Sequence, residues 1–378
     1  MKNKIIGVPF VLLVLLVLWF FITSLGHHGF QTEHGKKAFT AYIKDSVRVD
    51  VQLVYGKNNI PLKYFSHIWT PVCEEGTCYD LIVDVYWDLL GNFLSYKEDP
   101  ENPFTKFDHI KFSPADHERM QKILADKTSL LANYGAGDLV DNDLQVVSDV
   151  LDGLTGATYE PLSGSVVPGA VYSSHTLWHI VNGNVADSIR SHTETLMNDS
   201  LLVSMLRSDN YNHQLYALRK VDLKNERYIN EVFRLLNEGK SYVPFFAIDA
   251  LPRTIWASDS YQVRAMGLLE KVGFRMQNEI LNRLKGNPLD DKVLSRLILN
   301  INVLEPSQVE KAFTILDSNK GVLGNDSLKK MATLLNSKKT AVANAAFDLL
   351  STMGGHYPDI DHQVMEYKKE NLDKKNRP

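Results

Sequence analysis

The sequence has only two cysteines and no excess of positive charge. Cys73 and Cys78 are too few for a cysteine-built zinc site, and no suitably spaced histidine follows them closely. The formal net charge of −4 at pH 7 provides no basic field for a nucleic acid. We therefore expect no structural zinc and no DNA or RNA partner.

Several catalytic patterns are also absent. The chain has no Gly-x-Ser-x-Gly nucleophile elbow. His175 and His179 are spaced to share a metal on a helix, but position 176 is not the Glu of the metalloprotease motif. Asp141-Asn142-Asp143 lacks the Gly and the final Glu of a calcium loop, and we interpret it as a turn. The favoured interpretation is that His175 and His179 pack in the core or form hydrogen bonds. A shared metal is the alternative, and a hydrolase built on either histidine has the least support.

One long hydrophobic run is present at the N-terminus. Ile5 to Leu25 carries no charge and is long enough to cross a bilayer as a helix. Lys2 and Lys4 precede it, so that end is expected in the cytoplasm. This pattern predicts an uncleaved signal anchor with the remaining chain outside the cytoplasm, in the periplasm or cell envelope. Cleavage near Gly26 is the alternative.

An exported location changes the interpretation of the cysteines. Outside the cytoplasm an even count favours a disulfide between Cys73 and Cys78, with a redox-active pair as the alternative. Residues 74–77 would form the tip of a hairpin between them.

Residues 47–96 have mostly strand character. Val47 to Leu53 alternates apolar and polar residues, and Leu81 to Trp87 is rich in β-branched and aromatic residues. Gly91-Asn92 predicts a turn with a returning strand. Ser113-Pro114 predicts a helix start, and the helix is expected to run to about Ala132.

The motif Asp152-Gly153-Leu154-Thr155-Gly156-Ala157-Thr158 carries the one specific chemical signal. Its small residues would let an enzyme approach the Thr158 hydroxyl, and a helix that follows would point N–H groups at a phosphate there. The motif resembles the flavinylation signature of the FMN-binding domain family, which includes subunits of sodium-translocating NADH:quinone reductase. The wider resemblance covers roughly residues 40–185, a typical domain length.

The resemblance implies a covalent cofactor. Asp152, Thr155, Gly156 and Ala157 match the sequence that a flavin transferase recognises, and Thr158 matches the residue that receives FMN through its phosphate. This chain departs from the family downstream, where Tyr159-Glu160-Pro161 replaces the usual Thr-Ser pair. A glycine-containing turn with a threonine helix cap is the alternative interpretation.

The segment after the motif offers aromatic side chains. A helix is expected from about Pro168 to Asn182-Gly183. Tyr172 and Trp178 on this helix could stack on the flavin ring, with core packing as the alternative.

From Ser200 onward helix-length apolar segments alternate with polar turns. Paired helices recur on the order of every 35–45 residues, the range of helical solenoids. The segments His213 to Arg219 and Lys339 to Leu350 resemble the second helix of a HEAT repeat. Such repeats commonly present a concave surface to a protein partner; an irregular helical bundle is the alternative.

The expected class is α+β, with five segments. They are a transmembrane signal anchor (1–25), a linker (26–40), a small mixed FMN-binding-like domain (41–195), a HEAT-like solenoid (196–365) and a charged, disordered tail (366–378). The expected function is electron transfer between a flavin on Thr158 and a membrane or exported redox protein, rather than stand-alone catalysis. A non-redox scaffold of the cell envelope is the alternative.

Overall fold

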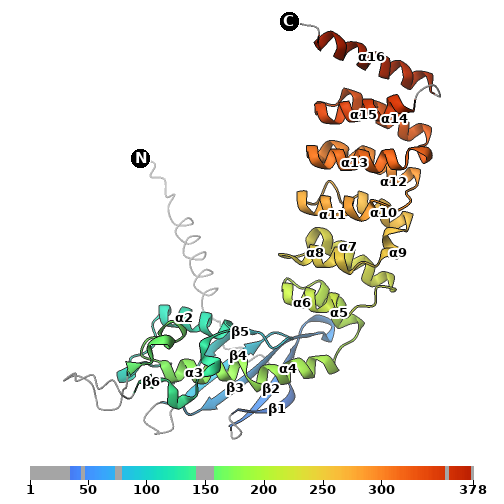
Figure 1. The fold of residues 1–378 in the computed structure, drawn as a ribbon. Helices are drawn as coiled ribbons and strands as arrows, with labels where there is room; N and C mark the ends of the chain where they lie inside the picture. The colour runs from blue at the N-terminus through green and yellow to red at the C-terminus, as the bar shows by residue number, and fades with distance from the viewer. Residues whose placement is uncertain (1–34, 44–46, 73–78, 142–156, 354–356, 376–378) are drawn as a thin grey trace, which may run out of the picture. The chain divides into compact units, whose positions relative to one another are not determined.

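The computed structural model describes residues 35–43, 47–72, 79–141, 157–353 and 357–375 (Figure 1). Internal contacts divide the chain into two units, Met1–Leu196 and Met197–Pro378. An antiparallel sheet opens the first unit and a largely helical region follows, so the α+β class is confirmed. Among the described residues no helix is both long and apolar enough to span a membrane. The predicted anchor, Cys73, Cys78 and residues 142–156 lie outside them.

A five-stranded sheet forms the body of the first unit. Each strand pairs antiparallel with the next along the chain. The strands are β1 (Lys36–Ile43), β2 (Val47–Tyr55), β3 (Pro61–Thr70), β4 (Leu81–Trp87) and β5 (Phe93–Glu98). The strands predicted at 47–53 and 81–87, and the strand returning after Gly91-Asn92, are confirmed.

One face of the sheet is buried under helices (Figure 1). In β4 the alternate residues Leu81, Val83, Val85 and Trp87 are buried, as a strand with one covered face requires. The Trp87 indole N–H donates to the Val181 carbonyl at 2.9 Å and joins the sheet to α3 (Val171–Asn182). Helix α4 (Asn184–Thr195) packs against β1.

The turn between β4 and β5 requires glycine at position 91. Gly91 has φ +71°, and a Cβ there would lie 2.3 Å from the Ala186 carbonyl oxygen. Gly91→Ala should therefore destabilise the first unit by about 2 kcal/mol or more, because strain and overlap combine. Gly137→Ala is the control, since a Cβ there would meet nothing within 4 Å. Equal urea midpoints for the two variants would contradict this account.

Helix α2 (Pro114–Ala125) begins as predicted and ends earlier. Ser113 is the N-cap and Pro114 the first helical residue, but Asp126 has extended backbone, so the expected end near Ala132 is wrong. The chain then turns into the 3-10 helix η3 (Leu130–Asn133), which still buries Leu131. A run of apolar residues at helical spacing is thus divided between two short helices.

The start of α2 contains a low-pKa carboxylate. Hydrogen bonds from Lys106 and from the Ser113 backbone and hydroxyl lower the pKa of Asp116 to about 2. The stability that this carboxylate provides is present above its unfolded pKa of about 4 and is lost as the pH falls towards 2. Wild type should thus exceed Asp116→Asn in urea midpoint at pH 7, and the gap should close near pH 2. A gap independent of pH would contradict the assignment.

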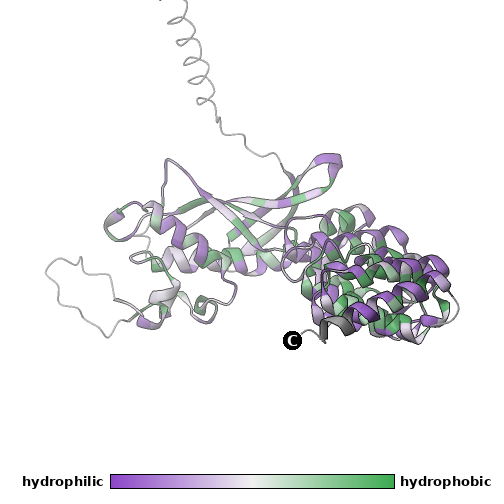
Figure 2. Ribbon diagram, turned by 90° about the horizontal axis from the view of Figure 1, so that it is seen from above, coloured by the Kyte–Doolittle hydropathy of each residue, from purple (hydrophilic) through white to green (hydrophobic). Residues whose placement is uncertain are grey.

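The second unit consists of helices in two rows (Figure 1). In one row α5 contacts α7, α10 contacts α12, and α12 contacts α14; in the other α6, α8, α11, α13 and α15 contact one another in succession. The bounds are α5 (Asp199–Leu206), α6 (Tyr211–Leu218), α7 (Glu226–Glu238), α8 (Val243–Ala250), α9 (Arg253–Trp256), α10 (Asp259–Met266), α11 (Phe274–Leu284), α12 (Asp291–Asn300), α13 (Pro306–Ser318), α14 (Asn325–Thr333), α15 (Thr340–Thr352) and α16 (Pro358–Lys375). Hydrophobic residues gather where the helices face one another (Figure 2).

Polar contacts between helices of different pairs join residues that are separated by a nearly constant number of positions in the sequence. Arg264 donates to Asn230, 34 residues away, and the Lys311 ammonium donates to Asn278, 33 residues away. Lys330 donates to the Ser295 hydroxyl, 35 residues away.

Near the C-terminus, α16 continues to Lys375, so the expectation of a disordered tail is wrong as far as that residue. Its first turn instead carries Asp359 and Asp361, which favour a helix start.

Candidate functional site

Thr158 lies on a two-residue strand at the side of the first unit. Strand β7 (Ala157–Thr158) pairs antiparallel with β6 (Val140–Asp141), and Thr158 faces Val140. The Tyr159 N–H donates to the Leu139 carbonyl at 3.0 Å and extends the pairing by one residue. The Thr158 side chain is half-buried. Asp152, Thr155 and Gly156 lie outside the described residues, so the structure places only Ala157 and Thr158 of the motif.

The segment after Thr158 differs from the expected helix N-terminus. It forms the 3-10 helix η5 (Glu160–Ser165), which has a proline in its first turn, and α3 begins only at Val171. Pro161 has no N–H to donate and Glu160 is acidic, so this turn does not attract a phosphate through its backbone. The structure therefore places no α-helix N-terminus immediately after Thr158. The same residues mark the departure from the Thr-Ser pair of the flavinylated family.

Arg119 fixes this segment to helix α2. Its Nε donates to the Val166 carbonyl at 2.7 Å, and its Nη2 donates to the Ser163 carbonyl at 2.7 Å. The two bonds satisfy carbonyls that η5 leaves without helical partners. Sequence reasoning did not single out Arg119, because its two acceptors lie 44 and 47 residues further along the chain.

Helix α3 is joined to the last turn of α2 and to the chain that follows it through four side chains. His175 and His179 bond through Nε2 to the carbonyls of Tyr134 and Leu131, at 2.8 and 3.0 Å. Trp178 and Asn182 donate to the carbonyls of Asp126 and Leu124, at 2.8 and 3.1 Å. The acceptors are backbone carbonyls where α2 ends and η3 follows, which need partners from elsewhere.

These bonds give the two histidines a structural role. A carbonyl oxygen only accepts, so Nε2 carries the proton in both rings. The ring centroids are 4.3 Å apart, as their i, i+4 spacing on one helical face requires. Across the described residues no three potential metal ligands lie together. Both histidines thus make the hydrogen bonds that the sequence interpretation favoured for them.

The two aromatic residues proposed to stack on a flavin differ in exposure. Trp178 is buried and its indole N–H is bonded, so it is placed in the core, the alternative given above. Tyr172 is half-buried on the same helix. Tyr134, on the chain that follows α2, contacts Tyr159, with ring centroids 5.8 Å apart.

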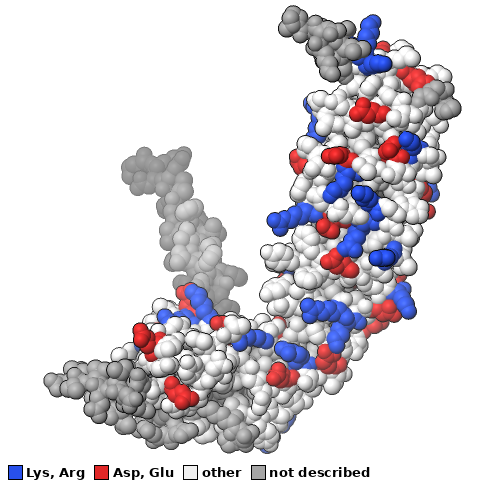
Figure 3. Space-filling view, in the orientation of Figure 1, with Lys and Arg blue, Asp and Glu red and all other residues white. Residues whose placement is uncertain are grey.

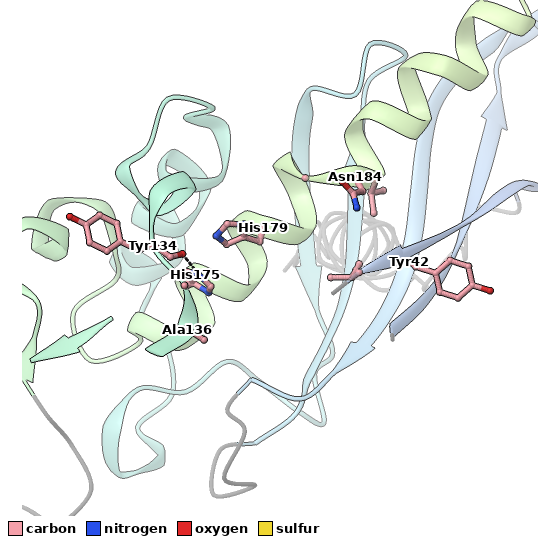
Figure 4. Close-up of a pocket in the computed structure, with 10 residues that line it drawn as sticks. Tyr42, Tyr134, Ala136, His175, His179 and Asn184 are labelled. Carbon is pink, nitrogen blue, oxygen red and sulfur yellow. Dashed lines mark hydrogen bonds between the residues drawn. The ribbon is translucent and has the colours of Figure 1, made fainter. Parts of the chain in front are cut away.

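A pocket of about 400 Å³ includes Tyr134 in its lining (Figure 4). His175 and His179 form one wall together with Ala136 and Tyr134, whose carbonyl bonds to His175, and Tyr42 and Asn184 lie on the other side. The lining also includes Tyr42 and Ile43 at the end of β1 and Asn184 and Val185 at the start of α4. The pocket therefore joins the sheet, α3 and the segment that leads into β6.

Comparison with known proteins identified no relationship: no family model, no curated protein and no solved structure matches the chain.

Proposed function

We propose that the chain carries FMN covalently on Thr158 and transfers electrons. The observation that carries the proposal is the position of Thr158: a half-buried threonine on a short strand pair, one residue from Tyr159, whose ring contacts a wall residue of the pocket. When bound, the flavin would supply one- or two-electron redox chemistry. The protein's own residues hold, orient and partly shield it.

The backbone around Thr158 is held in a way that suits an attached cofactor. Thr158 would hold FMN through a phosphoester, which needs no metal. The β6–β7 pairing and the Arg119 bonds fix the backbone on both sides of this attachment. The flavin would carry the chemistry, and the side chains around it would position it.

The membrane anchor and the helical unit complete the proposal. Residues 1–25 would hold the protein at the membrane with both units outside the cytoplasm, where a covalent link prevents loss of the flavin. The second unit is a HEAT-like solenoid, supported by its two rows of helices and by polar contacts 33 to 35 residues apart. It would dock a membrane or exported redox protein.

Intact mass and in-gel fluorescence test this function. The full chain is produced in a bacterial envelope with a flavin transferase. We expect the mass of one FMN, less water, on the peptide that contains Thr158, and a fluorescent band that survives denaturation. An unmodified mass with no fluorescence would overturn the proposal.

A protein-binding scaffold is the second candidate, favoured by exposed aromatics on the helical unit. Tyr211, Tyr242, Phe246 and Phe274 are 48 to 69% exposed and lie at or in α6, α8 and α11, successive members of one row. Exposed aromatics on neighbouring elements are typical of protein-binding surfaces. Lys and Arg are interspersed with Asp and Glu over the face of the helical unit in Figure 3, so no charge of one sign dominates there.

Complementation of a deletion strain separates the two candidates. If the scaffold function suffices, Thr158→Val should restore the strain and the double variant Tyr242→Ser, Phe246→Ser should not. Val322→Ser is the control, since Val322 is 52% exposed and lies outside α6, α8 and α11. Failure of Thr158→Val to restore the strain would favour the electron carrier.

A further inference from the structure

The pocket beside His175 and His179 belongs to the same substructure as Thr158. Tyr134 lines the pocket and contacts Tyr159, the residue after the attachment point. From Ala136 the chain continues through η4 (Ala136–Asp138) into β6, where Val140 pairs with Thr158. A group fixed to Thr158 is therefore tethered to the strand pair that continues from the lining segment.

The pocket has the size of a site for a small ligand. Its volume of about 400 Å³ lies within the ~300–1,000 Å³ range of ligand and cofactor sites. The walls combine the apolar side chains of Ile43 and Val185 with the polar amide of Asn184. An isoalloxazine ring has matching parts, an apolar dimethylbenzene edge and a pyrimidine edge rich in hydrogen-bonding groups.

Small residues and fixed rings shape this space. Gly135, Ala136 and Gly183 contribute no large side chain to the lining. Gly183 has to stay small, because a Cβ would lie 2.4 Å from the His179 carbonyl oxygen. The Nε2 bonds of His175 and His179 hold both rings in place before any ligand enters, which reduces the entropy cost of binding.

We infer that this pocket holds the isoalloxazine ring of the FMN attached to Thr158. The inference rests on the proposed function. A tether raises the effective concentration of the ring to about millimolar, so even a weak pocket is filled. The ring would lie against the imidazoles of His175 and His179 and beside Tyr134, while Thr158 retains the phosphate end.

Quenching of flavin fluorescence by iodide tests the ring position in the full chain. Iodide quenches only a ring that it can reach, so the quenching constant of wild type should be several-fold below that of free FMN. Ala136→Trp fills the pocket and should raise the constant towards the free value without changing the FMN content by mass. Ala132→Trp is the matched control, because Ala132 is exposed on η3 and is not a lining residue.

A milder variant tests the same ring position in case Ala136→Trp does not fold. Asn184 is exposed in the pocket lining, so Asn184→Ala should fold and should raise the quenching constant by a smaller factor. A wild-type constant equal to that of free FMN would overturn the inference while leaving covalent attachment in place. Equal constants for wild type and Ala136→Trp would also overturn it. Absence of FMN from wild type by mass would instead overturn the proposed function and the inference together.

Discussion

Thr158→Val should carry no covalent flavin, whereas wild type co-produced with a flavin transferase should carry one FMN per chain. Valine keeps the β-branched shape of threonine and lacks only the hydroxyl that forms the phosphoester. The backbone pairing of Thr158 with Val140 does not involve that hydroxyl, so β7 should persist. Because Thr158 is only half-buried, the substitution should change the free energy of unfolding by about 0.5 kcal/mol or less. Intact mass, in-gel fluorescence and a thermal melt measure the three outcomes.

A nearby hydroxyl provides the matched control. Ser163 is exposed on η5, five residues beyond Thr158, and Arg119 contacts its carbonyl rather than its hydroxyl. Ser163→Ala should therefore keep its full flavin content. Flavin retained on Thr158→Val would move the attachment to another residue. Flavin lost from both variants would indicate that the transferase fails to recognise the altered segment.

The sequence predicted those strands and helices along which the same pattern of burial recurs. Leu81 to Trp87 was predicted as a strand because its composition suits a pleated surface, and β4 has those bounds. The apolar segments of the helical region fall within or overlap α6 to α15, since each helix buries one face against its neighbours. Local pattern is sufficient where the same burial recurs along an element.

Prediction was less successful where contacts between residues far apart in the sequence determine the local structure. Leu131 lies within the helix predicted to run to about Ala132, but it belongs to η3 and not α2. The chain leaves α2 at Asp126, and Trp178 of α3 bonds to the Asp126 carbonyl. The contact between Tyr134 and Tyr159 joins residues that no local period relates. The motif indicated Thr158 as a candidate, whereas the pocket lined by Tyr134 depends on β1, α3 and α4, which only the fold brings together.

Leu297→Ala should destabilise the second unit by about 2–5 kcal/mol. Leu297 is fully buried in α12, which packs against α10 on one side and α14 on the other. Truncation leaves a cavity at the contact between successive helices, and a solenoid transmits stability mainly through such neighbouring contacts. The melting transition of the helical unit should therefore fall in temperature and broaden, because the helices on the two sides of α12 lose cooperativity.

Leu299 provides a control on the same helix. It is 52% exposed two residues further along, so Leu299→Ala makes the same chemical change without a cavity, and its cost should be about 0.5 kcal/mol or less. Circular dichroism at 222 nm follows both variants, since helices dominate the second unit. Equal melting temperatures would show that α12 does not couple its neighbours. A large loss of stability in Leu297→Ala, with an unchanged content of FMN on Thr158, would show that the helical unit can be destabilised while flavin attachment continues.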